Sequence, residues 1–188
     1  SKLNYLALSG NSLNGANPAT LNNLTALYTL RLNSNQFSSL PDLSNLTQLE
    51  QLQISYNPFD TNFPSWVNNL TNLRYFYAYS GGWTGSLPDL SNLSNLYVFA
   101  VGYNQLSGNL PDLSNATNLS RIHAASNQFM GTLPNWLGNM PNLYELNFSS
   151  NQLDGIIPNL SNSTNLHISK TIQTTNTYLR RFNQLTYL

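Results

Sequence analysis

Hydrophobic positions recur along this chain with a period of 22 to 24 residues. Each period opens with L-x-x-L-x-L, continues with polar residues and a proline, and closes with N-L-[ST]-x-L. A fixed period of this size predicts a solenoid, because no single repeat can bury its apolar face alone. The seven clear repeats open at Leu3, Leu27, Leu49, Leu73, Leu96, Leu119 and Leu143, and Leu166 opens a degraded eighth copy.

Each opener is expected to begin a short strand. In the fifth repeat, Leu96, Phe99 and Val101 should point inward, and the residues between them should alternate outward. Stacking such strands at about 4.8 Å each gives a parallel sheet. The pattern therefore predicts an α/β-type solenoid, with a parallel sheet on the concave face and short helical or 3-10 turns on the convex side.

Two polar columns are expected to hold each repeat in shape. A buried asparagine amide at a turn can satisfy backbone groups of its own repeat and of the next one. Each proline fixes φ and forces the chain to turn. Trp66 and Trp136 follow two of these prolines and are expected to pack over the outer helical turn. The asparagine column is Asn11, Asn35, Asn57, Asn104, Asn127 and Asn151, and the fourth repeat breaks it with Gly81, Gly82 and Trp83.

The periodicity assigns residues 1–166 to one solenoid domain. Residues 167–188 fit the framework only with a break, and they are interpreted as a degenerate repeat followed by the start of another. Both ends of the sequence fall inside the pattern, and solenoids need polar caps. We therefore expect a fragment of a longer chain.

Composition removes several classes of function. Charged residues are 7% of the chain, with seven Lys and Arg against seven Asp and Glu, so there is no basic surface for nucleic acid or anionic lipid. No apolar run is long enough to span a membrane. The chain has no cysteine, and His123 and His167 have no matching ligand set, so neither a metal nor a cofactor is expected.

One segment of the repeat resembles a known family. Leu106-Ser107-Gly108-Asn109-Leu110-Pro111 is similar to the L-x-G-x-[IL]-P signature of the plant-specific leucine-rich repeat proteins, and the segments beginning at Trp83, Phe129 and Leu153 repeat it. The resemblance implies a curved right-handed superhelix. It also implies a recognition module, of the kind found in plant receptor ectodomains, inhibitors of secreted enzymes and microbial surface proteins.

The outward strand positions are unusually rich in tyrosine and arginine. Nine of the eleven tyrosines fall on this concave face, including Tyr5 and Tyr56, and Glu50 and Glu145 lie there too. Tyrosine suits strands and pairs across a sheet, which is one explanation. A binding surface is the other, because tyrosine and arginine are enriched at interface hot spots. The candidate ligand-binding residues are Tyr28, Arg31, Arg74, Tyr75, Tyr77, Tyr79, Tyr97, Tyr103, Arg121, His123 and Tyr144.

The densest part of this set lies on the fourth and fifth strands, beside the break in the asparagine column. We expect ligand contact there. The N-x-[ST] motif is a second candidate feature: it is either an acceptor for N-glycans or a repeat motif that makes local backbone bonds. The candidate acceptors are Asn23, Asn45, Asn69, Asn92, Asn115, Asn118, Asn147, Asn159 and Asn162.

No arrangement of catalytic residues is expected to converge. The chain lacks cysteine and a glycine-rich phosphate loop, and its repeated aspartates are turn residues. The leading hypothesis is a non-enzymatic module, extracellular or at the cell surface, that binds a protein, peptide or glycan on its concave face. The alternative is a structural or adhesive protein, a stalk or filament subunit, that self-associates through its uncapped ends.

Overall fold

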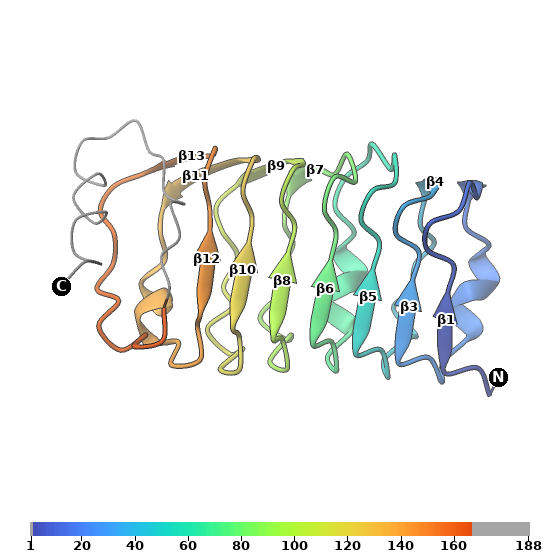
Figure 1. The fold of residues 1–188 in the computed structure, drawn as a ribbon, viewed down its shortest axis with the longest axis horizontal. Helices are drawn as coiled ribbons and strands as arrows, with labels where there is room; N and C mark the ends of the chain where they lie inside the picture. The colour runs from blue at the N-terminus through green and yellow to red at the C-terminus, as the bar shows by residue number, and fades with distance from the viewer. Residues whose placement is uncertain (1, 167–188) are drawn as a thin grey trace.

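In a computed structural model of the chain, stacked repeats form a row with strands side by side (Figure 1). The structure describes residues 2–166, so the degenerate repeat expected in 167–188 lies outside the described residues. The predicted α/β-type solenoid with a parallel sheet is confirmed.

One strand from each repeat joins a seven-stranded parallel sheet. The register aligns Leu30, Leu52 and Phe76 across neighbouring strands, so the central inward residue of every repeat enters the same apolar layer. In sheet order the strands are β1 (Tyr5–Ala7), β3 (Thr29–Arg31), β5 (Gln51–Gln53), β6 (Tyr75–Tyr77), β8 (Val98–Ala100), β10 (Arg121–His123) and β12 (Glu145–Asn147).

The core runs the length of the stack behind this sheet. Leu96, Phe99 and Val101 are buried, as the strand pattern predicts. Beneath the middle repeats the core is aromatic: Phe59 stacks on Trp83 with ring centroids 4.6 Å apart, and Phe63, Phe76 and Phe99 continue the cluster. Such rings pack at close to crystal density, which makes the middle of the sheet a stiff support.

The asparagine column forms the expected ladder. Asn127 Nδ2 donates to the carbonyls of Val101 and Ala124, which belong to successive repeats, and its Oδ1 accepts from the Leu106 N–H. The residue just before each ladder position has a left-handed backbone, with φ of 58° at Tyr103, for example. Its N–H donates to the next repeat, as Tyr103 does to the Ala125 carbonyl at 2.8 Å.

The length of a repeat determines whether its outer side forms a 3-10 helix or a turn. The openers of the first, third and sixth repeats are followed by the next opener after 24 residues, and each of these repeats has a 3-10 helix: η1 (Ala19–Asn23), η2 (Ser65–Asn69) and η3 (Asn135–Asn139). Trp66 and Trp136 lie in η2 and η3 and pack against the core, as expected. Shorter repeats turn instead, with Asp89 Oδ1 accepting from the Ser91 N–H at 2.9 Å.

Two smaller parallel sheets were not expected from the sequence. They form in the segment between the ladder asparagine and the proline, on the far side of the core. Gly85, Gly108, Gly131 and Gly155 provide the left-handed backbone that this segment needs, with φ of 73° to 77°. The strands are β7 (Thr84–Ser86), β9 (Gln105–Gly108), β11 (Gln128–Thr132) and β13 (Gln152–Asp154) in one sheet, and β2 (Asn14–Ala16) and β4 (Gln36–Ser39) in the other.

The break in the ladder has its origin in the core. A Cβ on Gly81 would overlap Trp83 Nε1, so glycine makes room for an indole that is 1% exposed. The Gly81 carbonyl accepts from the Phe59 N–H at 3.0 Å, where an asparagine side chain accepts in other repeats. Packing therefore explains the irregularity, and the ligand contact expected beside it stays a prediction.

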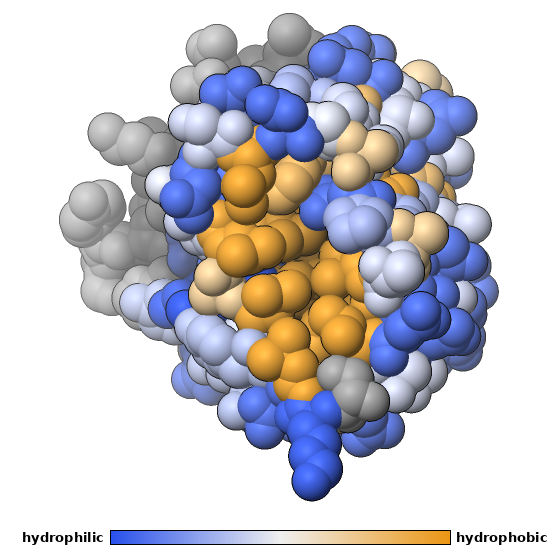
Figure 2. Space-filling model, turned by 90° about the vertical axis from the view of Figure 1, so that its right-hand side faces the viewer, coloured by the Kyte–Doolittle hydropathy of each residue, from blue (hydrophilic) through white to orange (hydrophobic). Residues whose placement is uncertain are grey.

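The end of the stack at the first repeat is apolar. Figure 2 looks at this end and shows an orange patch framed by polar residues. Leu3 and Leu13 are exposed there, and Leu6, Leu8 and Leu24 are only partly buried. In a solenoid this side of a repeat is the one that packs against a neighbouring repeat.

Candidate functional site

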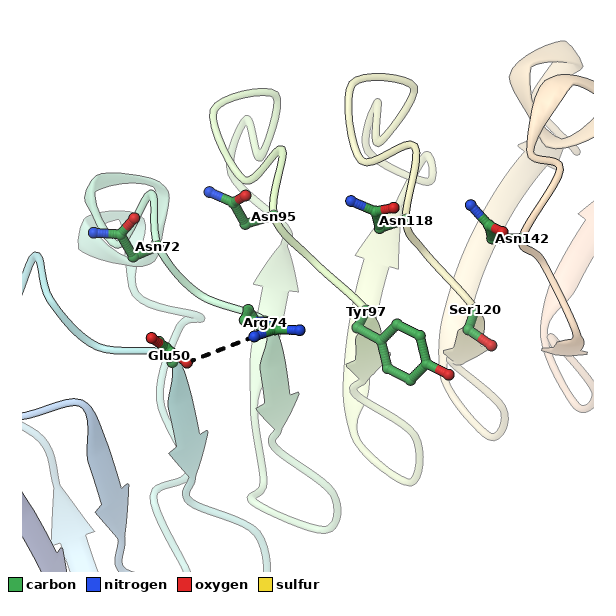
Figure 3. Close-up of a pocket in the computed structure, with 8 residues that line it drawn as sticks. All are labelled: Glu50, Asn72, Arg74, Asn95, Tyr97, Asn118, Ser120 and Asn142. Atoms are coloured by element: carbon green, nitrogen blue, oxygen red, sulfur yellow. Dashed lines mark ion pairs between the residues drawn. The ribbon is translucent and has the colours of Figure 1, made fainter.

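The inner face of the seven-stranded sheet carries two hollows, one at each end of the strands. The first is a groove of about 600 Å³ at the beginning of the strands, and it crosses the third to sixth repeats (Figure 3). We call it the Arg74 hollow. It is lined by Glu50, Asn72, Arg74, Asn95, Tyr97, Asn118, Ser120 and Asn142.

Successive repeats contribute four different side chains to the floor of the Arg74 hollow: Glu50, Arg74, Tyr97 and Ser120. Glu50 Oε2 lies 3.8 Å from Arg74 Nη1, and each side chain is 52% exposed. An ion pair this exposed contributes little to stability, so the guanidinium can exchange partners. Arg74 also lies over the ring of Tyr75 at 5.9 Å, and that ring meets Tyr97 edge-on at 5.7 Å.

The upper edge of the Arg74 hollow is a row of asparagine amides (Figure 3). Asn72 and Asn95 each donate through Nδ2 to a threonine carbonyl of the preceding repeat, Thr47 at 2.8 Å and Thr71 at 2.9 Å. Asn142 donates in the same way to the Thr117 carbonyl at 3.1 Å. These bonds fix the amides but leave a second hydrogen and the Oδ1 lone pairs for a ligand.

The second hollow, of about 260 Å³, lies where the strands end. We call it the Tyr79 hollow. Tyr56 and Tyr103 stand at its rim and are 57% and 63% exposed, whereas Tyr79 is half-buried. It is lined by Tyr56, Tyr79, Tyr103, His123, Ala125 and Asn147.

Tyr79 reaches across the fifth repeat to the sixth. Its hydroxyl lies 2.5 Å from His123 Nδ1, and the two groups share a hydrogen bond whose direction follows the tautomer of the imidazole. His123 Nε2 lies 3.0 Å from Glu145 Oε1, and Glu145 Oε2 lies 3.8 Å from Arg121 Nε. The result is a polar chain that runs from the end of β6, past β8, to β10 and β12.

The backbone of the fifth repeat makes this reach possible. A Cβ on Gly102 would lie 3.1 Å from Tyr79 Cε1, so the absence of a side chain lets the ring cross. Burial raises the pKa of Tyr79 well above its usual value, and the nearby Tyr77 and Glu145 raise it further. Burial also raises the pKa of Tyr77, although Arg121 opposes the shift.

The structure divides the predicted ligand-binding residues into groups. Arg74 and Tyr97 line the first hollow, and Tyr79, Tyr103 and His123 line the second. Tyr75, Tyr77 and Arg121 lie on the same strands without lining either hollow. The remaining candidates, on the second and seventh strands or just before them, lie outside both hollows: Tyr28, Arg31 and Tyr144.

Sequence reasoning missed the asparagine row. Asn72, Asn95 and Asn142 each precede a repeat opener, and this recurrence was the available signal. Asn118 and Asn147 were considered only as glycan acceptors, yet they line the two hollows. The other candidate acceptors lie elsewhere on the surface, and all of them are exposed: Asn23, Asn45, Asn69, Asn92, Asn115, Asn159 and Asn162.

Other kinds of site find no support in the part of the chain that the structure describes. Among residues 2–166 there is no group of three or more His, Cys, Asp or Glu side chains placed to hold a metal ion. The same residues contain no helix long and apolar enough to cross a membrane.

Sequence comparison identifies the repeat. A leucine-rich repeat model matches residues 1–59, and a second leucine-rich repeat model matches residues 118–140 and 142–163. The chain belongs to the leucine-rich repeat family. Receptor-like protein 39 of Arabidopsis thaliana is 42% identical to it over 92 residues, which are 46% of this chain and 10% of that relative.

Solved receptor ectodomains share the fold of this leucine-rich repeat chain. The plant peptide hormone receptor RGFR1 in complex with RGF2 superposes with a TM-score of 0.83 at 34% identity, over 88% of this chain and 28% of that one. The ectodomain of GASSHO1/SCHENGEN3 from Arabidopsis thaliana, in complex with CASPARIAN STRIP INTEGRITY FACTOR 2, gives 0.84 at 32% identity, over 89% and 21%. The chain thus spans about a quarter of each ectodomain.

Proposed function

We propose that this leucine-rich repeat chain is part of a non-enzymatic recognition module, at the cell surface or outside the cell, that binds an extended peptide in the Arg74 hollow. The observation that carries the proposal is the groove itself, which is open, about 600 Å³ in volume and continuous over four repeats. The resemblance to receptor ectodomains solved with peptide ligands supports it.

The chemistry of the groove suits a peptide. An asparagine amide offers both a donor and an acceptor, as a peptide backbone does, and Asn72, Asn95 and Asn142 present one amide per repeat. Below this row, Glu50 and Arg74 can each pair with a charged side chain of a ligand, and Tyr97 offers an exposed ring. Bonds from the asparagine row to the peptide backbone would provide affinity, and contacts of Glu50, Arg74 and Tyr97 with peptide side chains would provide selectivity.

A displayed library of random peptides tests this proposal. The chain is immobilised, peptides are selected, and the affinities of enriched peptides are measured by calorimetry. We expect Arg74→Ala and Tyr97→Ser each to weaken binding by about tenfold or more, since truncated hot-spot residues typically cost 1–2 kcal/mol or more. Met130→Ser, at an exposed position on β11 in the other sheet, is the matched control.

Two results would contradict the proposal. One is that no peptide is enriched over a blank surface. The other is that enriched peptides bind the Arg74→Ala and Tyr97→Ser variants as tightly as the native chain, with both variants folded by circular dichroism. Loss of binding in Met130→Ser alone would place the site on the opposite sheet.

A further inference from the structure

Tyr56 and Tyr103 occupy a backbone position that disfavours tyrosine. Their φ angles are 56° and 58°, in the left-handed region, which costs stability for any residue with a side chain. The equivalent positions in the other repeats hold only small residues: Gly10, Ser34, Ser80, Ser126 and Ser150. Because both rings are more than half exposed, the core gains little from them. The fold does not explain why these two positions are tyrosine.

The spacing of the two tyrosines leaves room for one ring. They stand two repeats apart with Ser80 between them, so their backbones are separated by roughly 10 Å, twice the strand spacing. A flat ring held between two aromatic faces needs about 7 Å, since carbon atoms in contact lie about 3.5 Å apart. The hollow is smaller than the ~300–1,000 Å³ of clefts that bury drug-sized ligands, which also favours a single ring.

The floor of the hollow is held in place before any ligand arrives. The Tyr79 N–H donates to Ser55 Oγ at 3.0 Å, and its hydroxyl is bonded to His123. Asn147 Oδ1 accepts from the N–H and the Oγ of Ser149, at 3.2 and 2.9 Å, which orients its amide hydrogens. Groups fixed in this way lose little freedom on binding.

The hollow is polar but carries no acid, lysine or arginine. The nearest carboxylate, on Glu145, is already in contact with His123 and Arg121. An anionic ligand would therefore find no lysine or arginine to pair with. An aromatic side chain would fit the rings but would offer no hydrogen-bond partner to the Asn147 amide, which is costly. A pyranose has apolar C–H faces for the rings and hydroxyl groups for the rim.

We propose that the Tyr79 hollow binds one pyranose ring of a neutral sugar, held between Tyr56 and Tyr103 and hydrogen-bonded to Asn147 and the hydroxyl-bearing floor. This site lies at the opposite end of the strands from the Arg74 hollow and shares no lining residue with it. It would therefore be a second recognition site on the same face, independent of the peptide groove.

Saturation-transfer NMR tests the proposal directly. The probes are the methyl β-pyranosides of glucose, galactose, mannose and xylose, added to unglycosylated chain so that Asn147 is bare. We expect at least one to bind with millimolar affinity, and we expect Tyr56→Ser and Tyr103→Ser each to weaken it by about tenfold. Serine is the matched choice because it occupies the same position in four other repeats. Tyr5→Ser, an exposed tyrosine at the far edge of the sheet, is the control.

Thermal unfolding separates binding from folding. If the tyrosines serve a ligand, Tyr103→Ser should melt at or above the temperature of the native chain while losing the sugar. A lower melting temperature together with unchanged sugar binding would overturn the proposal. So would binding of N-acetyltyrosinamide, a probe for an aromatic side chain, in place of all four sugars.

The tetrasaccharide of the sugar that binds identifies the source of the ring. Tighter binding of the tetrasaccharide assigns the ring to a glycan chain, and equal binding assigns it to a single sugar; either result supports the site. Because peptides are measured on Arg74 variants and sugars on Tyr103 variants, failure of one proposal leaves the other standing.

Discussion

On the inner face, positions with small residues leave space into which the large side chains of neighbouring repeats extend. Ala100 and Gly102 in the fifth repeat carry a methyl group and no side chain, respectively. The Tyr79 side chain therefore lies over this repeat and contacts His123. The sequence pattern places Tyr79 on this face, but it does not give the direction of its side chain. That direction depends on a glycine one repeat further on, which a column of leucines and asparagines does not reveal.

Burial of Tyr79 makes stability sensitive to alkaline pH. Its folded-state pKa is raised above the unfolded value of 10.0. Between those two pKa values the unfolded chain loses the proton and the folded chain keeps it, so the free energy of unfolding falls as pH rises above 10. Below pH 10 the contribution is fully present. Tyr77, whose pKa is also raised, acts in the same direction.

Urea unfolding at a series of pH values checks this expectation. Tyr79→Phe should reduce the loss of stability between pH 9 and pH 11 by about 0.5–1 kcal/mol, which is less than the full ~1.4 kcal/mol per pH unit because solvent partly screens the ring. Tyr5→Phe removes an exposed phenol and controls for the substitution itself. An unchanged pH slope in Tyr79→Phe would show that its proton plays no part in folding.

At the level of the element, each recurring residue type of the repeat determines one structural feature, and for this reason the fold can be predicted from the sequence. Leucine spacing predicts the strands, and the asparagine column predicts the ladder seen at Asn127. Proline predicts the turns. The smaller sheets escaped prediction because L-x-G-x-L lacks the alternation of a half-buried strand, and glycine there usually signals a bend.

The candidate site was only half predictable from its elements. The tyrosines on and beside the strands pointed to the face and the repeats that carry the two hollows, since Tyr97 and Tyr79 each line one. The amide row was overlooked because Asn95 and its equivalents lie just before the strands, outside the two-residue alternation. Recognition surfaces built at strand ends depend on loop geometry, which hydrophobic periodicity does not encode.

The fourth repeat offers a test of how its elements are coupled. Gly81→Asn restores the ladder residue but overlaps Trp83, and overpacking typically costs about 1–3 kcal/mol. Trp83→Leu restores the common core residue but leaves a cavity beside Phe59. With both changes the repeat regains the Asn-x-Leu pattern, and the leucine at position 83 no longer overlaps the side chain at position 81.

We expect the double variant to lose less stability than the two single variants lose together, by about 1 kcal/mol or more. Urea unfolding of the four proteins provides the cycle. The pair Asn11→Ala and Phe129→Leu, five repeats apart in the stack, should be additive and serves as a reference. Additive losses at Gly81 and Trp83 would show that the glycine is not there for the indole.

For the whole molecule, position along the stack determines how rigid a site can be. All residues that line the two hollows belong to the third or later repeats, and none belongs to the first two. The aromatic core of Phe59, Phe76 and Trp83 lies behind the same repeats. A binding face needs fixed side chains, and the interior of a solenoid, where every repeat has a neighbour on each side, provides the best support.

Hydrogen exchange should reveal this gradient. Amides of β5, β6, β8 and β10 bond to repeats on both sides, whereas among residues 2–166 β1 lies at the edge of the sheet and pairs with β3 alone. In a stack held by nearest-neighbour contacts, opening begins where a neighbour is missing. Peptides that cover β1 and β2 should therefore exchange faster than those that cover β6 and β8, by an opening free energy of about 1–3 kcal/mol. Equal protection along residues 2–166 would mean that the repeats open as one unit, and the rigidity of the hollows would then owe nothing to their place in the stack.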